Sequence, residues 1–153
     1  MKGGVTVNYY SLSIQNYGSA SAIGLDVGLL IDIADNVTWG FAAMNVNAPR
    51  IGSAKEKLPQ VLSTGLVYCP IKGGTISASV IKDVHFPVEL HIGVEYGVLD
   101  VIALRAGTTS DPSTLNAGIG IEYSLAKLDY AFTSHTELGI THQFSLSLNF
   151  GDL

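Results

Sequence analysis

The chain has 153 residues, of which 47% are apolar and only 14% are charged, and its net charge is −5 at pH 7. This length is typical of one domain, and the charged fraction is well below the roughly 25% of an average soluble domain. The negative charge and the lack of a basic cluster argue against nucleic acid as a partner. The single cysteine, Cys69, excludes an internal disulfide and a cysteine metal cluster.

The hydrophobicity is spread along the chain rather than gathered into long segments. No run of about 18 apolar residues could form a transmembrane helix, because Asp26 and Asp32 interrupt the longest candidate. The N-terminus shows no apolar core of a signal peptide. A hydrophobic chain without helix-length runs is typical of a membrane β-barrel, in which apolar and polar residues alternate.

Period-two alternation predicts about ten strands and little helix, so the expected fold is all-β, an antiparallel up-and-down transmembrane barrel. The expected strands cover residues 5–15, 19–33, 37–47, 60–69, 74–83, 87–97, 100–108, 114–124, 127–134 and 139–150. Residues 1–153 are expected to form a single barrel domain, or the C-terminal part of a longer barrel. In the second case the first and last strands would not pair fully.

The segment "NAGIGIEY", residues 116–123, alternates strictly between an apolar and a polar set. In a membrane barrel the apolar set, which ends in Tyr123, faces lipid, and the polar set lines the interior. Small polar substitutions are therefore expected to be tolerated at interior positions such as Gly120 and Ser145.

The connections between the strands suggest an orientation. Tight turns at "ADN", "PIKGG", "GVLD" and "SLAK" alternate with longer or more polar connections, as periplasmic turns alternate with outside loops in outer-membrane barrels. The longest connection, "NAPRIGSAKEKLPQ", carries Arg50, Lys55, Glu56 and Lys57. It is either a contact site for outside partners or a solvated charged loop.

Aromatic residues recur near the strand ends beside the tight turns. On the apolar face they would form a girdle at the membrane interface, because amphipathic rings favour the headgroup layer. The expected members are Trp39, Tyr68, Tyr96, Tyr123 and Phe150.

From about residue 24 onward, the order of several motifs resembles a known family. The motifs are "GLDVGLL", "LPQVLSTGLVY", "GVEY", "ALRAG", "GIGIEY", "LDYAF" and "GITHQFSLSLNFG". Together they resemble the C-terminal part of PorV/PorQ-type outer-membrane proteins, relatives of the FadL fatty-acid transporters. The resemblance implies a location in the bacterial outer membrane and a role in hydrophobic-solute transport or in type IX protein secretion and surface attachment. It also implies partners among outer-membrane lipids, hydrophobic small molecules and secreted cargo proteins.

Charged residues gather on the predicted interior face. Arg105 lies on the strand between those of Glu95 and Glu122, which suggests an ion-pair ladder across three strands. Such a network is either structural or part of a solute-selective constriction. Its expected members are Asp26, Glu89, Glu95, Arg105, Glu122 and Asp129.

No motif predicts an enzyme, a cofactor or a metal ion. Glu89, His91 and Glu95 share a strand face, but four histidines without a ligand motif make a weak metal signal. No serine is marked as a nucleophile by an identifiable base. Two other hypotheses stay open: a soluble lipocalin-like binding module with its apolar face inside, and a membrane-embedded enzyme.

Overall fold

A computed structural model describes residues 1–14, 18–52, 55–136 and 139–149, and these residues form strands joined by turns. In the described part of the chain, no helix is long and apolar enough to cross a membrane. The strands are β1 (Lys2–Ile14), β2 (Gly18–Ala34), β3 (Val37–Met44), β4 (Arg50–Ile51), β5 (Glu56–Lys57), β6 (Val61–Ile71), β7 (Gly74–Asp83), β8 (Val88–Leu99), β9 (Ile102–Ser110), β10 (Ser113–Tyr123), β11 (Ala126–His135) and β12 (Gly139–Leu148).

Ten of these strands form one antiparallel up-and-down sheet, in the order β1-β2-β3-β6-β7-β8-β9-β10-β11-β12. They correspond one to one with the ten strands predicted from the alternation. The order is linear, with β1 and β12 as its ends, so over the described ranges the sheet is not closed into a barrel. The two-residue strands β4 and β5 form a separate ladder that the alternation did not predict.

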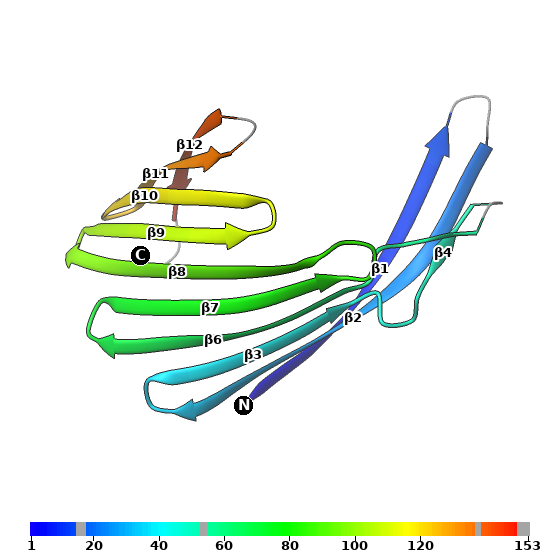
Figure 1. Ribbon diagram of the computed structural model, residues 1–153, viewed down its shortest axis with the longest axis horizontal. Helices are drawn as coiled ribbons and strands as arrows, with labels where there is room; N and C mark the ends of the chain where they lie inside the picture. Colours follow the sequence, from blue (N-terminus) through cyan, green and yellow to red (C-terminus); the bar gives the residue numbers. More distant parts are fainter. Residues whose placement is uncertain (15–17, 53–54, 137–138, 150–153) are drawn as a thin grey trace. The chain divides into compact units, whose positions relative to one another are not determined.

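The chain divides into two compact units, Met1–Leu66 with Val80–Val88, and Val67–Ser79 with Glu89–Leu153. In the first unit, β1 and β2 form a long hairpin that pairs from Lys2 with Leu30 to Ile14 with Gly18. Strand β3 lies between β2 and β6, and its pairing with β2 is limited to the Val27–Ala34 part of that strand. Beyond β3, the Val46 N–H donates to Leu25 O, and β4 lies against β2 (Figure 1).

In the second unit, β8 to β12 run side by side with regular registers (Figure 1). The tight turns have two residues each, and the second turn residue accepts a hydrogen bond from the neighbouring strand. Gly97 N–H donates to Gly73 O at 2.8 Å, Glu122 N–H to Val101 O at 2.9 Å, and Asn149 N–H to Leu125 O at 2.8 Å. These bonds fix the turns to the sheet.

The expected alternation of tight and longer connections is wrong between β9 and β10. Only Asp111 and Pro112 separate these strands, so this connection is as short as the tight turns. The polar run "TTSDPS" forms no long loop, because its threonines and serines continue both strands. Thr109 pairs with Thr114, and their hydroxyls are 2.8 Å apart.

In strands β7, β8 and β9 the apolar face of the sheet is the more exposed one. In β8, the apolar side chains of Leu90, Ile92, Val94 and Tyr96 are between 43% and 49% exposed. The polar residues that alternate with them are half-buried. In the described residues, Ala43 and Pro49 are the buried apolar side chains. A soluble sheet has the opposite pattern, with its apolar face against a core.

Candidate functional site

An arginine joins two carboxylates across the polar face of the second unit. Arg105 on β9 donates from Nε to Glu95 Oε2 on β8 at 2.5 Å, and from Nη1 to Asp129 Oδ1 on β11 at 2.6 Å. The guanidinium group is a planar fork with five donors, so it can bond two carboxylates at once. We call these three residues the Arg105 clasp.

The clasp crosses β10 because that strand carries glycines at the crossing. Gly118 lies opposite Arg105, and Gly120 lies opposite Asp129. A Cβ on Gly120 would come within 2.7 Å of Asp129 Oδ1 and 3.2 Å of Arg105 Nη1. The missing side chain therefore gives Arg105 its path to a strand two places away. The expectation that Gly120 tolerates small polar residues stays a prediction, and an added side chain there would require the ends of Asp129 and Arg105 to shift.

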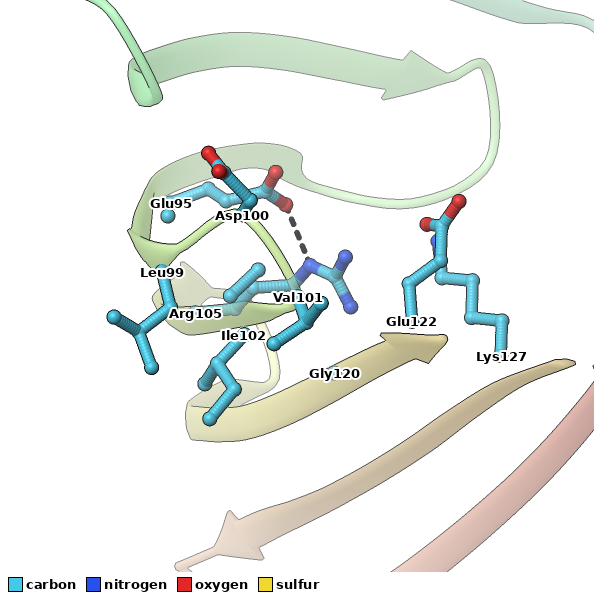
Figure 2. A pocket seen from close by; sticks show the side chains of 11 residues that line it. Glu95, Leu99, Asp100, Val101, Ile102, Arg105, Gly120, Glu122 and Lys127 are labelled. Carbon is cyan, nitrogen blue, oxygen red and sulfur yellow. Dashed lines mark hydrogen bonds and ion pairs between the residues drawn. The ribbon is translucent and has the colours of Figure 1, made fainter. Parts of the chain in front are cut away.

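An open hollow of about 200 Å³ lies beside the clasp, toward the tight turns. Figure 2 shows Glu95 and Arg105 joined on one side and Glu122 beside Lys127 on the other. Glu122 and Lys127 are directly opposite each other in the register of β10 and β11. Asp100, in the turn after β8, adds a further carboxylate to the lining.

The charges around this hollow are unequal. With Asp129 they comprise four carboxylates, Glu95, Asp100, Glu122 and Asp129, against two cations, Arg105 and Lys127. Since an excess of negative charge attracts cations and repels anions, this face would favour positively charged solutes in water. The lining residues include no serine, cysteine or histidine that could act as a nucleophile or base.

The predicted ladder is correct for Glu95 and Arg105 and wrong for Glu122. Arg105 bonds Asp129 instead, because the glycines of β10 let its side chain reach past the adjacent strand. Glu89 lies 3.2 Å from His91 Nε2 on the same strand and forms a separate pair. In the described part of the chain, no three His, Cys, Asp or Glu side chains are grouped so that they could hold a metal ion.

Asp26 belongs to a different cluster in the first unit. We call it the Asn45 cluster, and its members are Asn8, Tyr10, Asp26, Asn45 and Gln60. The Asp26 carboxylate accepts from Asn8 Nδ2 at 2.6 Å and from the Asn45 N–H at 2.8 Å. The sequence did not single out Asn45, although it is only 4% exposed. Its side chain accepts from Tyr10 Oη at 3.2 Å and donates to Pro59 O at 2.8 Å.

Asn45 holds both ends of the connection between β3 and β6. Its carbonyl also accepts from Gln60 Nε2 at 3.1 Å, so all its polar groups have partners. Gly24 lies beneath it, where a Cβ would overlap Asn45 Oδ1 and come within 2.8 Å of the Tyr10 ring. Asn45 has a positive φ of 54°, a conformation that asparagine adopts more readily than most residues. The one signal in the sequence was the turn-forming run "NVNAP".

The described members of the predicted girdle lie on the apolar face. Tyr68, Tyr96 and Tyr123 are exposed, and each precedes a tight turn of the second unit. In the first unit, Trp39 pairs with Ile31 just after the turn at Asp35 and Asn36, and its Nε1 donates to Thr64 Oγ1 at 2.9 Å. Phe150 lies outside the described residues. The membrane role of the girdle stays a prediction.

No protein-family description matches the chain, and no curated protein matches it at a significant level.

Proposed function

We propose that this chain is a membrane-spanning β-sheet of the bacterial outer membrane, part of a barrel whose apolar face contacts lipid. One observation carries the proposal: in β7, β8 and β9 the apolar side chains occupy the exposed face of the sheet, and the polar side chains occupy the half-buried face. Exposed apolar patches of this extent mark contact with a membrane or a partner. A soluble lipocalin-like module needs these same side chains in its core.

Strand length supports the same proposal. A transmembrane strand needs about 9–11 residues when it is tilted across the bilayer. The eight strands β3 and β6 to β12 have between 8 and 12 residues. The polar face would then line an aqueous interior, as in outer-membrane barrels.

The activity that we propose is transport of hydrophobic solutes or assistance in protein secretion at the outer membrane. This part of the proposal rests on the resemblance to PorV/PorQ-type proteins. The polar face contributes the Arg105 clasp and the acidic hollow beside it, which would set the charge preference of the interior.

The chain contains one tryptophan, and Trp39 on the apolar face is therefore a natural probe of lipid contact. The full chain is folded into phosphatidylcholine vesicles whose acyl chains carry bromine near the headgroup or near the chain end. We expect strong quenching of Trp39 fluorescence, greatest with bromine near the headgroup, because Trp39 lies just after a tight turn.

A control variant moves the tryptophan to the polar face, with Trp39→Phe and Ser79→Trp combined. Its fluorescence should be little affected by the brominated lipids. If Trp39 were as weakly quenched as this control, the apolar face would not contact lipid and the proposal would be wrong.

A further inference from the structure

Positive charge is concentrated on one short hairpin of the first unit. Arg50, Lys55 and Lys57 are three of the eight lysines and arginines in a chain whose net charge is −5. Strands β4 and β5 carry two of them, and Lys55 lies in the turn just before β5. All three side chains are exposed. We call these three residues the basic hairpin.

Two of these charges are placed directly against each other. Arg50 pairs with Lys57 in the β4–β5 ladder, and Ile51 pairs with Glu56. Neighbouring residues on a strand point to opposite faces, so Glu56 lies on the other side of the ribbon from Arg50 and Lys57. Like charges that face each other destabilise a strand pair. Across the described ranges, none of the three cations has an ion-pair partner.

The hairpin is held in place rather than left free. The Asn45 cluster fixes the start and the end of its connection, and Leu58 N–H donates to Pro49 O at 2.9 Å across the hairpin base. Strand β4 also lies against β2. The two facing cations are therefore presented as a fixed pair, and a bound anion would relieve their repulsion.

The position of the hairpin identifies the source of the anion. It follows the end of β3 at Met44, whereas Trp39 and the tight turn lie at the beginning of that strand. If β3 spans the bilayer, the hairpin lies just beyond the opposite edge of the apolar layer. Lipid phosphates occupy this depth, and cations near an anionic lipid surface are attracted to it.

We infer that the basic hairpin binds the phosphate groups of anionic lipids in the leaflet on the loop side of the membrane. This inference rests on the proposed function, because it requires that β3 crosses the bilayer. Arg50 would bond phosphate oxygens through two parallel N–H donors, and Lys57 would add a second charge from the facing strand. The chain as a whole is negatively charged, which opposes binding of anionic lipids. A preference for these lipids would therefore come from the hairpin.

The test measures the lipid shell around the folded full-length chain by electron spin resonance. The chain is reconstituted in phosphatidylcholine with trace spin-labelled phosphatidylglycerol or spin-labelled phosphatidylcholine. We expect the motionally restricted fraction to favour phosphatidylglycerol by about two- to fivefold at low salt and to lose this preference in 1 M NaCl. The double variant Arg50→Gln/Lys57→Gln should show no preference.

Two further variants serve as controls. The variant Arg50→Lys/Lys57→Arg keeps both charges and should keep the preference. The variant Lys2→Gln/Lys72→Gln removes two exposed charges elsewhere and should also keep it. An equal restricted fraction of both lipids around the wild-type chain would overturn this inference alone. If neither lipid were restricted, the proposed membrane location would fail as well.

Discussion

At the scale of single residues, two glycines decide where polar side chains can go. Gly120 opens the path of Arg105 across β10, and Gly24 leaves room for Asn45 above β2. Both glycines lie within strands, where glycine usually weakens the sheet. At both positions the absence of a side chain leaves room for a polar cluster above the strand.

Substitution of Gly120 by alanine should destabilise the chain. The added methyl group would force Asp129 Oδ1 and Arg105 Nη1 to shift. Because both atoms end flexible side chains, we expect a loss of about 1 kcal/mol, the low end for overpacking. The ion pairs alone contribute less, because the Arg105 side chain is still 37% exposed. The measurement is urea unfolding of the chain folded in lipid vesicles.

The matched control is Gly4→Ala in β1, where an added Cβ meets no atom within 4 Å. We expect this variant to be as stable as the wild type or slightly more stable, because alanine restricts the unfolded chain. If both variants had the same stability, the space above Gly120 would not be filled by the clasp.

A second prediction concerns Gly24. Alanine at this position would displace Asn45 and release the connection that carries the basic hairpin. Trypsin should then cleave faster after Arg50, Lys55 or Lys57, as followed by mass spectrometry of the folded chain.

Gly28→Ala on the same strand is its control, since the added Cβ would make only an ordinary contact at 3.9 Å with Phe41 O. Equal cleavage rates in the two variants would show that Asn45 does not hold the connection.

At the scale of elements, strand β7 offers a direct comparison of the two faces. Ala78 and Ser79 are adjacent small residues near the middle of the strand, the first on the apolar face and the second on the polar face. Arginine at Ala78 would point into lipid and should reduce stability by about 2–4 kcal/mol near the bilayer midplane. Arginine at Ser79 would point to the polar side and should cost much less.

The unfolding free energies of both variants, measured in the same vesicles, decide the facing. If Ser79→Arg were the more damaging change, the assignment of the two faces would be reversed. The soluble-module hypothesis would then be the better one.

The sequence predicted the strands well because their alternation is local. Ten runs with period two became the ten strands of the sheet, and "GTISASVIKD" forms β7 with the predicted bounds. The Asn45 cluster could not be predicted in this way. Its partners Asn8, Asp26 and Gln60 come together only when the chain after β3 turns back toward β2.

The candidate site was predicted only in part, for a related reason. The alternation placed Glu95, Arg105 and Asp129 on one face, but it could not show which pairs would form. The expected partner of Arg105 was Glu122 on the adjacent strand, whereas the glycines of β10 allow a longer reach to Asp129. When glycines lie on the strand between two strands that carry opposite charges, they therefore indicate that the two charged side chains can form an ion pair across that strand.

At the scale of the whole molecule, we expect the protein that carries this sequence to fractionate with the outer membrane. Its migration on denaturing gels should change on heating, as it does for proteins whose transmembrane sheet resists detergent until boiled. A chain recovered as a detergent-free soluble monomer would contradict this expectation, because its exposed apolar face has no cover in water.

The linear strand order also has a consequence for the path of folding. Each strand of the sheet pairs with the strand that precedes or follows it in this order, and most of these neighbours are separated by only two to four residues. Short loop closures lose little chain entropy, so such hairpins form early and fast. Residues 45–60 make the junction of β3 with β6 the one long closure among the described connections. In hydrogen-exchange pulse labelling during refolding, amides of the β8–β9 and β10–β11 hairpins should be protected first and those joining β3 to β6 last.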